Sequence, residues 1–165
     1  MNATSYAGGQ IEGAFSLLDT AMDGVTDDQY NWKPDAATCN PMWKVHAHAL
    51  AATDFFVNFL LKGQPPLWGA MAQHAGLPAN SLEVWGSAAR LPAATLVDYG
   101  RQIRASVNEY ISTLSDADLE RQLDTRIMGV QTVGWVLQLV ATHTAGHTGE
   151  IATVKGMQGV KGLPF

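Results

Sequence analysis

The spacing of hydrophobic and polar positions along the chain predicts four long helices. In the first, over about 5–25, apolar residues recur at intervals of three and four, as on the buried stripe of an amphipathic helix. These residues are Ile11, Phe15, Leu18, Met22 and Val25. By the same reasoning, further helices are expected over about 41–62, 93–114 and 132–157. The second has a clear start, because Asn40 is a good N-cap residue and Pro41 suits a first turn.

The connections between these helices predict a bundle with a crossover. The segment from Gly63 to about Pro92 is rich in glycine and proline, and a connection this long usually crosses the whole molecule or covers a site. A shorter stretch, about 121–131, could form a small extended excursion. Four long helices with such connections describe an all-α four-helix bundle. At 165 residues, with no linker or repeat, the chain is expected to form a single domain over 1–165.

The charge and the N-terminal sequence narrow the possible partners. The formal net charge is −5 and the isoelectric point is near 5.4, which argues against nucleic acid because a phosphate backbone requires a basic face. The N-terminus lacks a basic region followed by an apolar core, and no run approaches about 18 uninterrupted apolar residues. We therefore expect a soluble cytoplasmic protein that binds neither nucleic acid nor a membrane.

Cysteine usage limits the kinds of site that the chain can build. Cys39 is the single cysteine, so the chain can form no internal disulfide and no site made of several thiolates. Any metal would have to rely on histidine, carboxylate and water.

Two histidines in the fourth helix are the first candidate metal ligands. His143 and His147 lie four apart, which on a helix places them about 40° apart in projection and about 6 Å apart along the axis. Two imidazoles so placed can share one metal ion. Thr144 follows the first histidine, so this is not the HExxH protease signature, which has its general base there. The alternative is a pair of ordinary half-buried helix residues.

The second helix offers one more ligand, and two residues compete for the role. His46 and His48 are about 160° apart in projection, so both cannot face the same metal. Periodicity slightly favours His46, which lies nearer the centre of the apolar arc. In the fourth helix, Glu150 falls on the stripe of His143 and His147, where it could orient a histidine or accept a proton from a bound water. A solvated or interface carboxylate is the alternative for Glu150.

Four blocks of sequence resemble the DinB-like superfamily in order and spacing across almost the whole chain. They are Trp32-Lys33-Pro34, the run from Asn40 to His48, the run from His143 to Ile151, and the tail from Gly159 to Phe165. The resemblance implies an up-down-down-up bundle with its crossover between the second and third helices. It also implies a divalent metal held by His48, His143 and His147, and it is the reason for choosing His48 over His46.

The resemblance also implies a range of activities. Family members are often homodimers, and some are thiol-dependent S-transferases or isomerases that use glutathione-like, mycothiol-like or bacillithiol-like cofactors. Three neutral imidazoles leave positions open on Zn²⁺, Ni²⁺, Fe²⁺ or Mn²⁺, as in a catalytic site. Such an ion can bring the pKa of a bound water or thiol into the neutral range. We therefore expect a metal-dependent hydrolase or a low-molecular-weight-thiol transferase with Glu150 as catalytic residue, acting on a small molecule. The alternative is a non-catalytic metal-binding or scaffold bundle.

The predicted helix over 41–62 also favours a homodimer. It is apolar nearly all round, and a helix of this kind is normally covered by another surface. The residues concerned are Trp43, Leu50, Phe55, Phe59 and Leu61.

Overall fold

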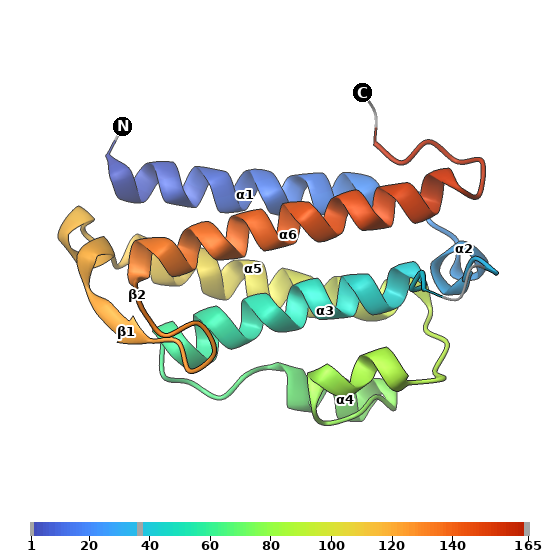
Figure 1. Ribbon diagram of the computed structural model, residues 1–165, viewed down its shortest axis with the longest axis horizontal. Helices are drawn as coiled ribbons and strands as arrows, with labels where there is room; N and C mark the ends of the chain where they lie inside the picture. Colours follow the sequence, from blue (N-terminus) through green and yellow to red (C-terminus); the bar gives the residue numbers. More distant parts are fainter. Residues whose placement is uncertain (1, 36–37, 164–165) are drawn as a thin grey trace.

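The computed structural model, which describes residues 2–35 and 38–163, is mostly helical (Figure 1). The long helices are α1 (Ala3–Met22), α3 (Met42–Asp54), α5 (Val97–Ser112) and α6 (Val133–Gly156). The shorter ones are α2 (Asp27–Asn31), α4 (Trp68–Ala75) and the 3₁₀-helices Ser81–Gly86, Ala93–Leu96 and Asp116–Glu120. The predicted all-α fold is confirmed. Residues 164 and 165 of the tail used in the resemblance lie outside the described residues.

A two-stranded hairpin occupies the stretch in which the sequence predicted an extended excursion. Strands β1 (Gln122–Asp124) and β2 (Val130–Thr132) pair antiparallel, with Leu123 opposite Gln131. Thr132 then becomes the N-cap of α6, because its side chain accepts a hydrogen bond from the Trp135 amide. The hairpin therefore leads directly into the helix that carries two of the candidate ligands.

The long helices pack around one hydrophobic core. Helix α1 contacts α6 and α5, and α3 contacts the same two helices. Figure 1 shows α1 and α6 side by side along the length of the molecule, with α3 beyond α6. The largest fully buried side chains come from all of these helices and include Ile11, Leu18, Trp43, Ile103 and Ile151. This packing holds the facing sides of α3 and α6 together, which is where the candidate histidines lie.

The second predicted helix is not uniform, which corrects the expectation of an unbroken helix over about 41–62. Helix α3 ends at Asp54, and the chain continues as a π-helix over Phe55–Leu61. The buried Asp54 carboxyl accepts hydrogen bonds from Asn58 Nδ2 at 2.6 Å, the Trp68 amide at 2.8 Å and the Tyr99 hydroxyl at 2.8 Å. These bonds fix the junction to α4 and α5. An apolar pattern cannot reveal this change, because it depends on partners far along the chain.

The crossover between the π-helix and α5 runs along α3 and returns to the start of α5. Lys44 donates to the Trp85 carbonyl oxygen at 2.8 Å, which holds the 3₁₀-helix of the crossover against α3. Asn31 fixes the far end, since its side chain donates to the Leu91 carbonyl and accepts from the Leu91 amide. The crossover thus lies against the face of α3 that carries His48, consistent with the expectation that it covers a site.

The apolar surface of α3 is mostly covered within the chain itself. Trp43 and Leu50 are buried, and Leu61 is buried at the end of the π-helix. Only Phe55 and Phe59 of the five residues remain half-buried. The hydrophobic character of this helix is therefore explained by intramolecular packing and no longer argues for a dimer.

Among the described residues, no helix combines the length and the hydropathy needed to cross a membrane.

Candidate metal centre

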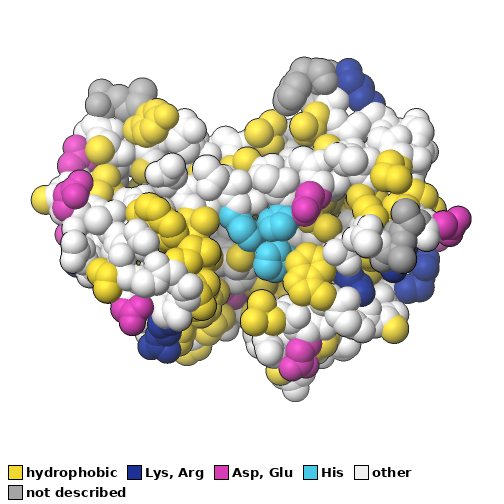
Figure 2. Space-filling view, viewed as in Figure 1, with side chains coloured by type: hydrophobic (Ala, Val, Ile, Leu, Met, Phe, Trp, Pro, Cys, Tyr) yellow, Lys and Arg dark blue, Asp and Glu magenta, His cyan; other side chains and the backbone are white. Residues whose placement is uncertain are grey.

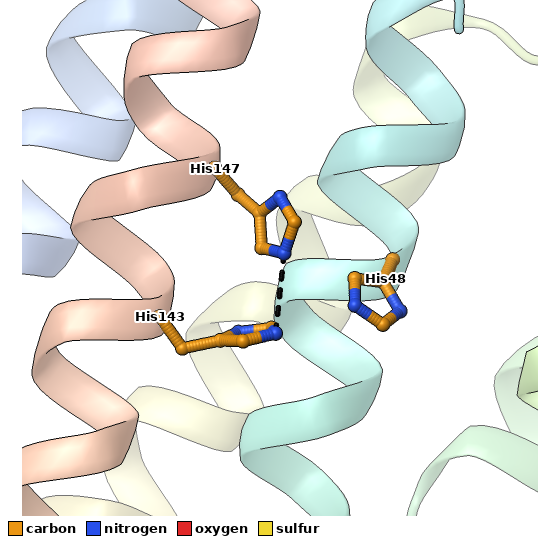
Figure 3. A group of neighbouring side chains, drawn as sticks. All are labelled: His48, His143 and His147. Carbon is orange, nitrogen blue, oxygen red and sulfur yellow. Dashed lines mark hydrogen bonds between the residues drawn. The ribbon is translucent and has the colours of Figure 1, made fainter.

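His143 and His147 lie one turn apart on the same side of α6, as their spacing predicts. Their Nε2 atoms are 3.1 Å apart, and their ring centroids are 4.3 Å apart (Figure 3). Close approach of α6 to α3 is possible because small residues lie at the contact. Thr144 is buried there, and its hydroxyl lies 3.5 Å from the hydroxyl of Thr53 on α3.

His48 reaches the same place from α3. Its ring centroid lies 5.1 Å from that of His143 and 4.8 Å from that of His147. Each histidine offers one ring nitrogen to a common point, and these three nitrogens lie within 4.8 Å of one another. Figure 3 shows the rings of both α6 histidines turned toward His48. The structure therefore brings together the three residues that the resemblance nominates.

His46 lies elsewhere, in the interior of the protein. It is 5% exposed, and its Nδ1 is 2.9 Å from the hydroxyl of Tyr30. Burial lowers the pKa of His46 to about 4, so its imidazole is neutral at pH 7. His46 does lie nearer the centre of the buried face of α3, as the hydrophobic periodicity indicates. That position, however, directs it into the core and away from the other histidines.

Glu150 is placed to orient His147. Its Oε2 lies 2.5 Å from His147 Nδ1, three residues earlier on α6. A carboxylate only accepts hydrogen bonds, so Nδ1 carries a proton in this pair, and in the neutral imidazole the lone pair is then on Nε2. A carboxylate behind a metal-ligating histidine fixes the tautomer and the ring orientation. Of the roles considered for Glu150, orientation of a histidine is the one that this contact supports.

The electrostatics of the cluster favour neutral imidazoles. Burial, with smaller contributions from the neighbouring His147 and His48, lowers the pKa of His143 to about 4. Burial and His147 also lower the pKa of His48, while the charge of Glu150 opposes this shift. A metal ligand must be deprotonated. At neutral pH, His48 and His143 therefore already have the protonation state that metal binding requires.

The nitrogen positions fit a divalent ion with small adjustments. Zinc binds imidazole nitrogen at about 2.0–2.1 Å, which for a tetrahedral site separates the ligand atoms by roughly 3.3 Å. The His143 and His147 nitrogens, at 3.1 Å, are close to this value, and His48 must approach by at most about 1.5 Å, a shift within reach of a side-chain rotation. Three histidines leave at least one coordination position for another ligand.

Trp85 forms a wall of the site, which the sequence did not assign to it. Its ring centroid is 4.9 Å from that of His48. The crossover was expected to cover a site, but the pattern of residues could not indicate which aromatic side chain would meet a histidine. In Figure 2 the histidine side chains gather at one place on the visible face, with hydrophobic side chains on both sides. The histidine of the crossover, His74, is exposed and lies outside the cluster.

A family model for the DinB superfamily matches residues 10–151. The chain belongs to the DinB superfamily. The matched region includes all three clustered histidines and Glu150, so the family resemblance seen in the sequence is confirmed. A search of curated proteins finds no match to the chain.

Solved structures support the same fold for this DinB-superfamily chain. The crystal structure of a conserved protein from Enterococcus faecalis is similar, with a TM-score of 0.78 and 16% sequence identity. The alignment covers 94% of this chain and 96% of that one. At this level of identity the likeness concerns the fold alone.

Proposed function

We propose that this DinB-superfamily protein binds a divalent metal through His48, His143 and His147 and uses it to act on a small electrophilic molecule. The observation that carries the proposal is the convergence of three imidazole nitrogens from two helices within 4.8 Å. Imidazole ligands can bind Zn²⁺, Ni²⁺, Fe²⁺ and Mn²⁺, with an affinity that differs from one metal to the next. We propose a metal-dependent hydrolase or a transferase that uses a low-molecular-weight thiol.

The residues around the histidines have distinct roles in this proposal. A bound divalent ion would supply Lewis-acid chemistry, lowering the pKa of a water or thiol at an open position. Glu150 holds His147 with Nε2 toward the ion, through the 2.5 Å contact at Nδ1. Glu150 is 58% exposed, so it is also accessible to accept a proton during the reaction. Trp85 shields one side of His48 from solvent.

Metal analysis tests the first part of the proposal. Protein purified without an affinity tag should retain or take up about one equivalent of metal per chain, and His143→Ala should not. Less than about 0.2 equivalents, unchanged after addition of Zn²⁺ or Ni²⁺, would contradict it. Metal-loaded protein is then assayed with small esters and, separately, with an aryl halide and a panel of low-molecular-weight thiols. His143→Ala is the control for background reaction in both assays.

The alternative is a metal-binding or scaffold bundle without catalysis, and access to the metal distinguishes the two. A catalytic centre binds exogenous ligands such as azide or hydroxamate, which change the absorption spectrum of the Co²⁺-loaded protein. A closed structural site does not respond. The partly exposed His147, at 18%, favours an accessible centre.

Further aspects of the proposal concern fold, location and assembly. We infer an up-down-down-up order for the long helices, which the shared direction of α1 and α6, both running from left to right in Figure 1, supports. A cytoplasmic location and a homodimer also belong to the proposal, the latter on the family resemblance alone. Light scattering at micromolar concentration measures the mass directly, and a monomer mass would contradict the dimer.

A further inference from the structure

A cavity of about 440 Å³ adjoins the histidine cluster. His48 and His143 form part of its wall, so a molecule lodged in it would lie beside the proposed metal. This volume lies in the lower part of the range of volumes found for small-molecule binding sites. A second cavity, of about 720 Å³, is lined by residues of α4 and α5 and none of the three histidines. The smaller cavity is therefore the one that could serve the centre.

Four separate segments build the apolar walls of this cavity, and one of them is α6, which contributes Leu139. The end of α3 contributes Ala51 and Ala52, and the π-helix contributes Phe55 and Phe56. The crossover contributes Leu82, and the tip of the hairpin contributes Ile127 and Met128. The π-helix matters here because it changes the direction of the side chains that follow Asp54. The two phenyl rings at its start lie 5.4 Å apart in an edge-to-face arrangement.

The lining of the cavity carries no charge among the described residues. Apart from His48 and His143, its polar side chains are Asn80 and Ser81. Arg126, at the hairpin tip, does not line the cavity, and its guanidinium lies 4.8 Å from the centroid of the Phe59 ring. A charged group buried in this cavity would lose hydration without an ionic partner, which is costly.

The mouth of the cavity exposes apolar side chains that a ligand would cover. Leu82 is 67% exposed, Ile127 63% and Met128 45%. Of the seven large hydrophobic side chains that are exposed among the described residues, these three line the cavity. Gathered exposed apolar side chains next to a polar centre are typical of a ligand site.

We propose that the substrate has an uncharged, apolar body that occupies this cavity and a head group that ligates the metal. The inference rests on the proposed metal centre and adds the chemical class of the molecule that it serves. It predicts that affinity increases with the length of the apolar part of the ligand. It also predicts that molecules with charged bodies, such as peptide-like thiols with several carboxylates, do not fill the cavity.

Alkyl hydroxamates of increasing length test this with metal-loaded protein. Each carries the same metal-ligating head, so acetohydroxamate measures the head alone and octanohydroxamate adds a six-methylene extension. Affinity is expected to rise about two- to fourfold per methylene, which makes octanohydroxamate roughly fiftyfold tighter or more. Isothermal titration calorimetry measures both affinities without reference to catalysis.

The hairpin offers a matched pair of variants. Ile127 and Val130 are both β-branched and are 63% and 61% exposed, but only Ile127 lines the cavity. Ile127→Asn should weaken the binding of octanohydroxamate roughly three- to tenfold and leave the affinity for acetohydroxamate and the metal content unchanged. Val130→Asn should change none of these three quantities. Equal effects of the two variants on octanohydroxamate would overturn the assignment of the cavity.

A metal-free measurement separates failure of this inference from failure of the metal centre. The neutral dye Nile red should bind the metal-free protein and be displaced by 1-octanol far better than by ethanol, with weaker binding in Ile127→Asn. If acetohydroxamate binds the metal-loaded protein, but length adds no affinity and the dye does not bind, the apolar cavity is overturned and the metal centre stands. If the dye binds with this pattern but no metal does, the cavity is supported and the metal centre is overturned.

Discussion

Glu150 accepts a hydrogen bond from Nδ1 of His147 at 2.5 Å, one turn farther along the same helix. The pair occupies positions i and i+3 of α6, so helical geometry alone brings the two side chains together. The contact leaves His147 Nε2 directed at His143 Nε2, 3.1 Å away. The carboxylate thus determines which nitrogen of His147 is available to a metal.

Replacement of Glu150 should weaken metal binding. Glu150→Ala removes the acceptor at Nδ1 and frees both the tautomer and the ring orientation of His147, which typically costs about 10- to 100-fold in metal affinity. Glu150→Gln keeps an amide oxygen that can accept the same hydrogen bond and should lose less. Competition with a chromophoric chelator measures the affinities.

Glu120 provides the control for this comparison, because it is an exposed carboxylate outside the histidine cluster. Glu120→Gln should leave metal affinity unchanged. If Glu150→Ala binds metal as tightly as the unmodified protein but loses activity, Glu150 acts on the reacting molecule and does not orient the ligand.

The two histidines of α3 should differ in what their removal affects. His48→Ala should abolish tight metal binding with little change in stability, since His48 is only half-buried. His46→Ala should keep the metal but lower the free energy of unfolding by about 2–4 kcal/mol, because it leaves a cavity and deprives the buried Tyr30 hydroxyl of its partner. Urea denaturation and metal analysis of both variants make the comparison. Metal loss confined to His46→Ala would show that the ligand assignment on α3 is wrong by two residues.

Much of the helical framework could be predicted because burial imposes the helical period on the sequence. The prediction of a helix over about 132–157 agrees closely with α6, Val133–Gly156. The first helix ends earlier than the predicted Val25, because the chain turns at Asp23, which is extended, and Gly24, which has a φ of +67°. Val25 nevertheless packs against the core from outside the helix. Hydrophobic periodicity reports burial, and burial continues beyond the end of the helix.

The site was less predictable because it depends on contacts between distant segments. Hydrophobic periodicity favours His46 because periodicity identifies the centre of a buried face. A metal ligand must instead lie at the edge of that face, where it opens to a cavity. The pattern across several positions of the family, which favoured His48, agrees with the geometry. Trp85 and Ile127 reach the site through the crossover and the hairpin. No local pattern indicates where such segments return to the long helices.

The stability of the metal-free protein should fall as the pH drops from 7 to 5. The pKa of His46 is lowered to about 4 in the folded protein, against about 6.5 in the unfolded chain. Between these values the unfolded state binds more protons, so the contribution of a neutral buried His46 is fully present above about pH 6.5 and is lost as the pH falls toward 4. For this residue the loss between pH 7 and pH 5 is about 2 kcal/mol.

His46→Gln tests this assignment, because glutamine does not titrate and can still accept a hydrogen bond from Tyr30. Urea denaturation at pH 7 and pH 5 should show a smaller decrease in the variant, by about 2 kcal/mol. An unchanged decrease would mean that other groups, such as His143 with its own pKa of about 4, account for the acid sensitivity.

Asp54 should be a major determinant of stability where α3 meets the crossover. Its fully buried carboxyl accepts from the Trp68 amide, the Tyr99 hydroxyl and Asn58 Nδ2. Burial and the neighbouring Asp54 raise the pKa of Tyr99 well above its usual range, so the phenol stays a donor. Asp54→Asn turns an amide NH₂ toward at least one of these donors and should cost about 2–4 kcal/mol in the free energy of unfolding. Urea denaturation measures the loss, and limited proteolysis should show faster cleavage between Gly63 and Pro92.

Asp98→Asn removes only a surface ion pair with Arg101, so it should change stability by less than about 1 kcal/mol. If both variants were equally stable, the buried hydrogen bonds of Asp54 would not be what holds the crossover to α3.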